Sequence, residues 1–488
     1  TFAARWTRTN QTSQLHALRS SMEFAVLGSA WALPGALKIL QGTSMQWFQQ
    51  SMYHTLLLPA LSLSLLLAWL ARPAAAEKLP PGFLKHLASY MIVWMCCIAA
   101  DWLQGPYVYA LYSAYGFSES AIMALFVAGY GASGVCSCGI GSVADCFGRK
   151  KCCMAFCIFH MIAGITMHWN LYPLLMLGRI SSGIGTAILF SCFECWMVSE
   201  HNFRHRFSSS LLSYMFGLNF CAMYFVAVLS GLGAQFAVDN TQLSAVRGSM
   251  YVGGFTVPYD ISIALLCIGF ALIALLWKEN YGDGQKPGQL LICDALCLLI
   301  KDPSCRRLCI IVAIFEGSMY VFVSNWTLAL QSQDIQPPHG LIFALFMMAA
   351  MCGSSVATLG RGMIPRRQLR FILLLSVLSF AVASRSACGA VGCCLGAFLT
   401  FEFCVGWYFP CVGILKSECV PEQIRGSMYN LFRVPLNVLV LVLLLTHIGT
   451  ELRFAICSFL LSFAVLATFG LVGHKQPLPE TVEVASSP

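Results

Sequence analysis

The sequence has few charged residues. Lysine, arginine, aspartate and glutamate together make up 10% of its 488 residues, whereas an average soluble domain carries about 25%. Hydrophobic residues make up 58% and the mean hydropathy is +0.73, so there is too little polar surface to cover a water-facing globule of this size. The shortage of charge excludes soluble, disordered, collagen-like and coiled-coil classes and indicates a polytopic membrane protein.

Signatures of catalytic sites are missing as well. The sequence contains no HExxH zinc motif, no Walker phosphate loop and no hydrolase-type grouping of serine, histidine and acid. His160 and His168 lie in an apolar run, which is typical of packing or interface residues. Cys192 and Cys195 are three residues apart, but no histidine or second cysteine pair at metal-site spacing accompanies them. We therefore expect neither an enzyme nor a nucleotide-driven pump, and neither a metal nor a cofactor.

Apolar runs of about 20 residues, the length at which an α-helix crosses a bilayer, fill most of the chain. A first run at 55–71 precedes twelve more. The twelve lie at residues 88–111, 120–143, 152–168, 171–198, 210–237, 257–277, 308–330, 340–359, 371–387, 389–415, 428–447 and 453–473. We predict an all-α polytopic membrane protein with twelve transmembrane helices and one extra transmembrane helix ahead of them. The segment 1–54 is poorly readable, because Pro34 and Gly35 interrupt its apolar run.

Basic residues indicate how the helices are oriented. From residue 149 onward, lysines and arginines gather in alternate loops, and the opposite loops hold only Arg247, Arg385 and Arg453. Loops rich in lysine and arginine stay in the cytoplasm, so the twelve helices begin and end there and residues 474–488 form a cytoplasmic tail. The net charge of +8 thus reflects membrane topology, and we expect a lipid bilayer, not a nucleic acid, as partner.

The longest charged interruption, which contains glycine and proline, separates the twelve helices six and six. We therefore predict an N-terminal six-helix bundle at 85–277, a cytoplasmic linker at 278–307 and a C-terminal six-helix bundle at 308–473. Parallel repeats of this kind are a common construction of transporters, so the two halves are expected to match each other.

Charged residues do occupy matching positions inside the two halves, separated by a nearly constant number of residues along the sequence. The matched pairs are Asp101 with Glu316, Arg179 with Glu402, and Glu194 with Lys416. Gly183 and Gly406, each four residues after a matched charge, correspond as well. An unpaired ion in the hydrocarbon region is costly, so these charges, together with Arg433, either lock helices together as structural pairs or line a central cavity. We expect a cavity role for at least two of them.

The strongest local motif is GSVADCFGRKK, in the short loop after the second of the twelve helices. Its glycines allow a tight crossover, its aspartate can accept hydrogen bonds from helix ends, and its basic residues can pair with an acidic partner in one conformation only. We expect a gating loop whose key residues are Gly141, Asp145, Gly148, Arg149 and Lys150. The motif resembles the loop signature of the major facilitator superfamily. LGRISSGIGTA around Arg179 resembles that superfamily's fourth-helix pattern, in which the arginine faces the central cavity.

Longer segments resemble one family within that superfamily, the molybdate-anion transporters. They are AADWLQGPYVYALY, LLMLGRISSGIGTAILFSCFECW, WKENYGD, IFEGSMYVFVSNW, GWYFP and VPEQIRGSMYNLFRVPLN. The resemblance covers about 84–473, and it implies a major facilitator fold of two six-helix bundles and the uptake of molybdate. The chain departs from the expected patterns at Cys195, where the family has alanine, and at Ala357, where the second-half loop lacks its aspartate.

Secondary transport by alternating access is the mechanism we expect, with two bundles rocking around a site near the middle of the membrane. Molybdate is a tetrahedral dianion, so its site needs hydrogen-bond donors and a retained cation, and a guanidinium supplies both. Arg179 is the first candidate for binding and Arg433 the second, although Arg433 is also placed to act as a gate. The further side chains expected to donate hydrogen bonds to the anion or to line its site are Trp102, Tyr107, Tyr320, Asn325 and Trp326. The alternative for the aromatic ones is that they anchor the helices at the membrane interface.

Carboxylates are expected to serve a different purpose. Moving a dianion inward against a negative interior costs about 2.3 kcal/mol per charge per 100 mV, so proton cotransport would help. The candidate proton acceptors are Asp101, Glu194, Glu316 and Glu402. Two other functions stay open: transport of another solute, such as sulfate, a sugar or an organic anion, on the same fold, and a non-transporting receptor on a transporter body. We expect a monomer in the cell membrane.

Overall fold

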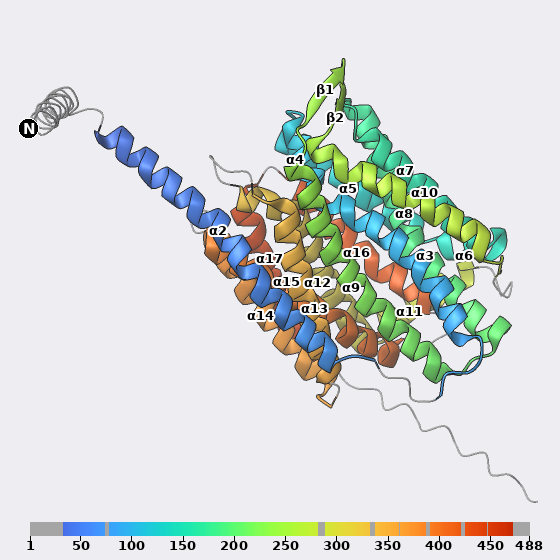
Figure 1. Ribbon diagram of the computed structural model, residues 1–488. Helices are drawn as coiled ribbons and strands as arrows, with labels where there is room; N and C mark the ends of the chain where they lie inside the picture. The colour runs from blue at the N-terminus through green and yellow to red at the C-terminus, as the bar shows by residue number, and fades with distance from the viewer. Residues whose placement is uncertain are drawn as a thin grey trace, which may run out of the picture.

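Long helices make up nearly all of the computed structural model, with a small β-hairpin at one end (Figure 1). The structure describes residues 33–73, 78–281, 288–331, 337–360, 362–386, 391–420, 425–446 and 448–471. Most of the segment predicted to be poorly readable, up to residue 32, and the predicted tail at 474–488 lie outside the described residues.

Helices form at every predicted span of the first half. They are α3 (Phe83–Gln104), which continues through a 3₁₀ turn (Gly105–Tyr107) into α4 (Val108–Ala114), α5 (Glu119–Ser137), α7 (Arg149–Thr166), α8 (Tyr172–Ser199), α9 (Ser209–Asp239) and α10 (Val257–Leu276). A short helix, α6 (Ile140–Phe147), lies in the predicted gating loop, and a π-helical turn (Glu200–His205) follows α8. Ser118 and Ser208 cap α5 and α9, because their hydroxyls accept hydrogen bonds from N–H groups of the first turn.

The second half repeats this pattern of long helices. They are α12 (Pro303–Leu330), α13 (His339–Leu359), α14 (Pro365–Ser386), α15 (Val391–Cys419), α16 (Arg425–Leu445) and α17 (Thr450–Thr468). Two more helices flank the bundles: α2 (Leu33–Leu70) precedes them, and α11 (Gly288–Lys301) forms within the stretch predicted as a linker.

Eleven helices in the described part of the chain are long and apolar enough to cross a membrane. They do not include α7, which begins with three basic residues, or α16, whose apolar part is the shorter Leu431–Leu445. These two helices occupy the remaining predicted spans. The prediction of an all-α polytopic protein with two six-helix bundles and an extra N-terminal helix is therefore confirmed.

A β-hairpin between α9 and α10 was not expected. Its strands β1 (Ser244–Arg247) and β2 (Met250–Val252) pair antiparallel. Gly248 at the turn has φ 57°, a left-handed conformation that favours glycine. Strands this short leave little alternating pattern in a sequence dominated by long apolar runs, which is why the sequence did not indicate them.

The matched glycines explain how the same pair of helices packs in each half. A Cβ on Gly183 of α8 would lie 2.2 Å from the carbonyl oxygen of Gly129 on α5, and one on Gly406 of α15 would lie 1.9 Å from that of Ala350 on α13. Each half thus packs its fourth helix onto its second through a glycine that permits close backbone approach. This agreement supports the internal repeat.

The two halves meet along two helix pairs, α5 with α16 and α9 with α13. Following the orientation predicted from the loop charges, we call the end where α5 finishes and α16 begins the inner end, and the opposite one the outer end. The extra helix α2 runs along the outside of the second half (Figure 1) and packs on α13. Most of its described side chains are exposed, which suits contact with lipid.

Candidate functional site

Side chains from three helices of both halves converge between α5, α12 and α16. They are Tyr130, Gly134, Glu316, Tyr320, Arg433, Leu436 and Asn437, and the cavity among them is about 10 Å³. That space suits about one water molecule. The two halves are therefore closed around this point, and the residues that line it include two charges matched or singled out in the sequence.

Arg433 connects the halves near the inner end. Its guanidinium donates a hydrogen bond to the hydroxyl of Ser137, the last residue of α5. One turn further along α16, Asn437 packs against Gly134, where an added Cβ would lie 2.5 Å from its Nδ2 atom. The contact between α16 and α5 is thus tight enough to close the inner end on this side.

Glu316 is neutralised by a lysine that the sequence did not assign to binding. The Nζ of Lys416 lies 3.3 Å from its Oε1, and the Tyr408 hydroxyl donates to the same oxygen over 3.3 Å. The ammonium also lies 5.3 Å from the ring centre of Tyr429. Repeat matching marked Lys416 as a counterpart of Glu194, but only the crossing of α12 and α15 brings it to Glu316.

Arg179 is a cation without a counterion in the described part of the chain. Its guanidinium lies 5.2 Å from the ring centre of Phe126 on α5 and beside Gly129, where a Cβ would be 2.9 Å from an Nη atom. Its Nε is buried without a hydrogen-bond partner, and no carboxylate of the described residues forms an ion pair with it. A guanidinium in this position is costly unless an anion joins it.

Tyr130 lies between the two arginines along α5. Its hydroxyl and that of Ser324 on α12 are 3.1 Å apart, and its ring centre is 4.7 Å from that of Tyr320. Gly129, beside Arg179, and Ser137, beside Arg433, are separated by about 12 Å along the helix axis. The arginines thus lie at two depths of one helix, with tyrosine hydroxyls between them.

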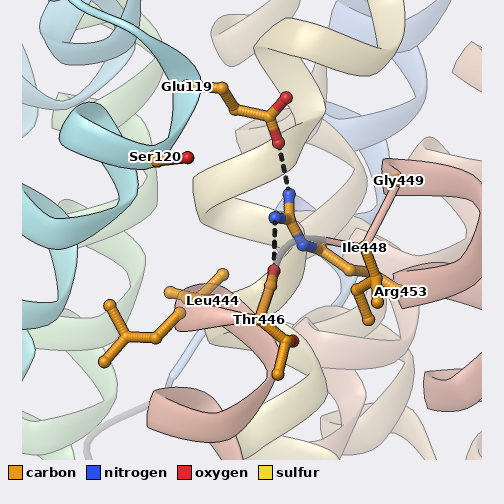
Figure 2. Close-up of a pocket in the computed structure, with 8 residues that line it drawn as sticks. Glu119, Ser120, Leu444, Thr446, Ile448, Gly449 and Arg453 are labelled. Atoms are coloured by element: carbon orange, nitrogen blue, oxygen red, sulfur yellow. Dashed lines mark hydrogen bonds and ion pairs between the residues drawn. The ribbon is translucent and has the colours of Figure 1, made fainter.

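Asn325 lies in a different cluster, at the outer end. Its Oδ1 accepts a 2.8 Å hydrogen bond from buried Arg453, which also pairs with Glu119 at 2.7 Å. The same guanidinium donates to the carbonyl oxygens of Leu443 and Thr446. Figure 2 shows it between Glu119 and Thr446. Leu443 and Arg433 are about 15 Å apart along α16, so Asn325 is not part of the Arg433 cluster.

A larger pocket of about 420 Å³ adjoins this outer cluster. It is lined by Glu119, Ser120, Leu444, Leu445, Thr446, Ile448, Gly449 and Arg453. Glu119 belongs to the first half, whereas Arg453 belongs to the second, so their ion pair holds the halves together here. The outer pair and the inner Arg433–Ser137 contact lie at opposite ends of α5.

Three of the predicted aromatic residues, Trp102, Tyr107 and Tyr320, also lie at the contact between halves. The Tyr107 hydroxyl donates to Gln235 over 3.1 Å and accepts from the N–H of Gly340 at the start of α13. The Trp102 ring centre is 5.7 Å from that of Phe343, and its Nε1 is buried without a hydrogen-bond partner. Trp326 packs edge-on against His339. Among these aromatics, Tyr320 alone lines the Arg433 cavity.

The other predicted carboxylates form no ion pair with Arg179 or Arg433 within the described residues. Oδ1 of Asp101 lies 2.9 Å from Nε2 of His160, inside the first half. Glu402 is buried in α15, and within the described ranges it forms no hydrogen bond or ion pair. Glu194 is exposed on α8. Only Glu316 of the four candidate proton acceptors adjoins the Arg433 cavity.

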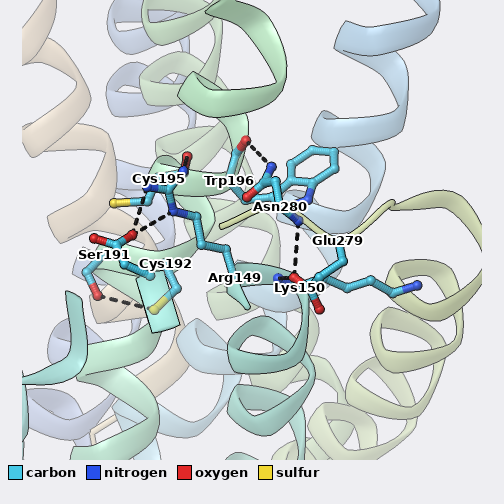
Figure 3. Close-up of polar contacts among 9 residues, drawn as sticks. Arg149, Lys150, Ser191, Cys192, Cys195, Trp196, Glu279 and Asn280 are labelled. Atoms are coloured by element: carbon cyan, nitrogen blue, oxygen red, sulfur yellow. Dashed lines mark hydrogen bonds and ion pairs between the residues drawn. The ribbon is translucent and has the colours of Figure 1, made fainter. Parts of the chain in front are cut away.

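The predicted gating loop binds the ends of neighbouring helices (Figure 3). Arg149 donates to Asp145 over 3.0 and 2.8 Å and to the carbonyl oxygen of Cys195. The backbone N–H of Lys150 donates to Glu279 over 2.7 Å. These contacts tie α6 and α7 to the ends of α8 and α10, all within the first half.

Its two glycines differ in position. Gly148 has φ 107°, and a Cβ there would lie 2.5 Å from the carboxyl carbon of Glu279. The tight turn therefore occurs at Gly148. Gly141 lies inside α6, where an added Cβ would meet nothing within 4 Å.

Comparison with known proteins agrees with this architecture. A family model described as sugar transporters with 12 transmembrane segments matches residues 52–407. The chain is 31% identical over 417 residues to a molybdate-anion transporter of Xenopus laevis, covering 82% of this chain and 89% of the relative. It is 29% identical over 434 residues to the molybdate-anion transporter of Danio rerio, and the match covers 80% of this chain and 88% of that relative.

Solved transporters share the fold at low identity. The nucleoside transporter NupG matches with a TM-score of 0.62 and 16% identity, over 79% of this chain and all of that one. The xylose transporter XylE from E. coli matches with a TM-score of 0.62 and 12% identity, and the match covers 81% of this chain and 98% of that one. The chain has two six-helix bundles, the same glycine-mediated helix crossing in each half, and relatives that are molybdate-anion transporters. It is therefore a multi-pass membrane transporter that belongs to the molybdate-anion transporter family of the major facilitator superfamily.

Proposed function

We propose that the protein takes up molybdate by alternating access of its two six-helix bundles. The observation that carries the proposal is Arg179, a guanidinium inside the first half without a counterion among the described residues. A bound oxyanion removes the electrostatic cost of that charge. The curated relatives named molybdate-anion transporters support the choice of substrate.

Charge balance favours a dianion over a neutral solute. Lys416 is already neutralised by Glu316, which leaves Arg179 and Arg433 as cations without a carboxylate partner among the described side chains near the contact between halves. Because they lie at two depths of α5, the two guanidinium groups offer positive charge and several hydrogen-bond donors at successive points on the path of a dianion. The hydroxyls of Tyr130 and Tyr320 add donors between them, as a tetrahedral ligand requires.

The contacts that hold the halves together support alternating access. The cavity of about 10 Å³ at Arg433 is too small for an oxyanion, so α5 and α16 have to separate before one can enter or leave. Separation at the outer end requires the Glu119–Arg453 pair to break, and separation at the inner end requires loss of the Arg433–Ser137 contact. Opening one contact while the other persists exposes the arginines to one side at a time.

The inward direction, the cell membrane and coupling to protons complete the proposal. Loops rich in basic residues support a cytoplasmic position for the inner end. Entry of a dianion into a negative interior is opposed by the membrane potential, and each proton that accompanies it lowers that cost by one charge. Proton coupling would therefore let the carrier accumulate a scarce anion.

The test is uptake of labelled molybdate into cells that lack a molybdate carrier of their own. We expect uptake by the wild type, competition by tungstate, which is also a tetrahedral dianion of similar size, and weaker competition by sulfate. Arg247→Gln, on the exposed hairpin, serves as the matched control for substitutions of internal arginines. A wild-type protein that inserts into the membrane and takes up no molybdate would contradict the proposal.

A sugar is the second candidate substrate, because the matching family model is described as sugar transporters. A neutral sugar does not need an unpaired arginine, and its carrier would tolerate Arg179→Gln better than an anion carrier would. Labelled hexose and pentose in the same cells distinguish the two. Ligand binding without any flux would instead indicate a receptor on a transporter body.

A further inference from the structure

Three tyrosine hydroxyls lie within electrostatic reach of the Arg179 guanidinium. They belong to Tyr112 near the end of α4, Tyr130 on α5 and Tyr259 near the start of α10. The Tyr259 hydroxyl donates to the carbonyl oxygen of Gln104 over 3.2 Å, and the Tyr130 hydroxyl shares a hydrogen bond with a serine of α12. The Tyr112 hydroxyl has no hydrogen-bond partner among the described residues. Of the three, it alone keeps an unused donor.

Burial makes that unused donor costly. The Tyr112 side chain is 0% exposed, and a hydroxyl taken out of water without an acceptor destabilises the fold. The hydroxyl of Tyr172, which also acts on it electrostatically, donates to the carbonyl oxygen of Ala121 instead. Nε of Arg179 is likewise buried without a partner. Two buried donors, one of them charged, thus lack an acceptor in the same region.

The surroundings of Arg179 supply no acceptor of negative charge. Its guanidinium lies over the ring of Phe126 and against Gly129, both on α5, and α5 also contacts the α4 segment that carries Tyr112. None of the ion pairs formed by the described carboxylates includes Arg179. An acceptor that satisfies both donors therefore has to come from outside the protein.

The first helix is interrupted close to Tyr112. The helix α3 ends at Gln104, a 3₁₀ turn with Pro106 at its centre follows, and α4 resumes at Val108. Interrupted helices of secondary transporters form their binding sites. Beyond the turn, α4 contacts α12 of the second half. Tyr112 therefore lies on a segment that adjoins both halves.

The depth of these groups suits an anion that arrives from the outer end. Arg179 lies seven residues after Tyr172, where α8 begins at that end, which corresponds to about 10 Å along the helix. Tyr112 lies two residues before the outer end of α4. Opening of the outer contact would expose both groups before the inner Arg433 is reached.

We propose that the Tyr112 hydroxyl is a second donor of the anion site: it donates a hydrogen bond to one oxygen of the tetrahedral oxyanion whose charge Arg179 offsets. Such an anion has several oxygens, so it can accept from the guanidinium and from the phenol at the same time. A hydrogen bond to a charged acceptor is stronger than one between neutral groups. The inference rests on the proposed function and adds a specificity-determining residue to the same site.

Tyr115, three residues further along the chain, provides a matched control. It is also buried, but its hydroxyl donates to the carbonyl oxygen of Met167 over 2.6 Å. Its removal takes away a hydrogen bond formed within the protein, whereas removal of the Tyr112 hydroxyl takes away none. The same change, tyrosine to phenylalanine, should therefore have different effects on stability and on uptake at the two positions.

The first measurement is thermal unfolding of the purified full chain in detergent without molybdate. Tyr112→Phe should leave the apparent Tm unchanged or raise it, because a buried donor without an acceptor is gone. Tyr115→Phe should lower the apparent Tm by about 1–3 °C, because the carbonyl oxygen of Met167 loses its donor. An equal decrease for both variants would show that the Tyr112 hydroxyl has a partner within the protein. That result would overturn the proposal whether or not molybdate is carried.

The second measurement is the concentration dependence of labelled molybdate uptake in cells without a carrier of their own. Tyr112→Phe should raise the half-saturating concentration by about tenfold or more and keep the maximal rate within about two-fold. Competition by tungstate should weaken by a similar factor. Tyr115→Phe should keep the half-saturating concentration within about two-fold. A wild-type value for Tyr112→Phe would overturn the proposal, whereas no uptake by folded wild type would contradict molybdate transport itself.

Discussion

The guanidinium of Arg179, which we propose to bind molybdate, has no counterion among the described residues and is therefore costly to the fold. Arg179 contacts an aromatic ring and a glycine, neither of which offsets a full charge. Proteins tolerate such a residue when a ligand supplies the opposite charge, and the cost is then recovered on binding. Stability and transport should therefore respond to its removal in opposite directions.

Arg179→Gln tests this contrast. We expect molybdate uptake to fall by roughly 30-fold or more, because loss of a buried charged partner costs about 2–5 kcal/mol. The apparent Tm of the purified protein should stay the same or rise, because an uncompensated charge is gone. Uptake assays and thermal unfolding in detergent measure the two effects. Near-normal uptake by this variant, with Arg247→Gln as control, would remove Arg179 from the site.

Glu316 and Lys416 should behave as a structural pair. Lys416→Met leaves a largely buried carboxylate without its cation, and we expect the apparent Tm to fall by several degrees. Adding Glu316→Gln should restore part of the loss, because the double variant has no unpaired charge. Thermal unfolding of both single variants and the double variant gives the coupling energy. Purely additive losses would show that the 3.3 Å contact contributes nothing.

At the scale of helices, two glycines set the distance between the second and fourth helix of each half. Gly183 and Gly406 were matched by sequence alone, and both lie where a Cβ would overlap a facing carbonyl oxygen. The repeat is thus expressed in packing as well as in charge. Helix contacts of this kind depend on small residues, because lipid supplies no hydrophobic drive for helices to associate.

Gly406→Leu should push α15 away from α13. The added side chain would overlap the backbone of Ala350, and overpacking typically costs about 1–3 kcal/mol or more. We expect a lower yield of folded protein and an apparent Tm several degrees below the wild type. Gly413→Leu is the control on the same helix, because a Cβ at Gly413 meets nothing within 4 Å. Equal effects of both substitutions would contradict the packing argument.

The extra helix α2 should be dispensable for the fold. Among its described residues only Tyr53 and Ser64 are buried, and its principal contact is with one helix, α13. A chain beginning at Lys78 should still insert and carry molybdate, with a modest decrease in apparent Tm. Size-exclusion chromatography and uptake provide the measurements. Aggregation of the shortened chain would show that α2 is needed to assemble the bundles.

At the scale of the whole molecule, the proposed alternating access makes the two contacts at opposite ends of α5 a balance between two conformations. The outer one joins Glu119 to Arg453 and the inner one joins Ser137 to Arg433. Weakening one of them should favour opening at that end, because the equilibrium depends on the difference between the two. Neither contact alone needs to be strong for the shift to be measurable.

Glu119→Gln should loosen the outer end. An ion pair with one exposed partner contributes about 0.2–1 kcal/mol, so backbone amides near the outer ends of α5 and α17 should exchange hydrogen roughly 1.4- to 5-fold faster. Ser137→Ala should have the corresponding effect at the inner end. Hydrogen–deuterium exchange with mass spectrometry measures both, and Arg247→Gln, on the exposed hairpin, is a surface control. Uniform changes along α5 would contradict two separate contacts.

Sequence by itself determined the membrane spans, the repeat and the family. A helix in a bilayer satisfies its own backbone hydrogen bonds, so its existence and length are local properties that an apolar run records. The loop signature and the matched glycines are local as well. The sequence did not indicate the hairpin between α9 and α10, because its strands are too short to show an alternating pattern of apolar and polar residues.

Only the tertiary structure decided which charges meet. Glu316 pairs with Lys416, 100 residues away, Asn325 with Arg453, 128 residues away, and Asp101 with His160, a residue whose sequence context indicated packing. Arg179 stands out because it meets no such partner among the described residues. An ion pair forms across helices whose relative rotation and depth no local pattern specifies, and that geometry separates the paired charges from the one that we propose to bind an anion.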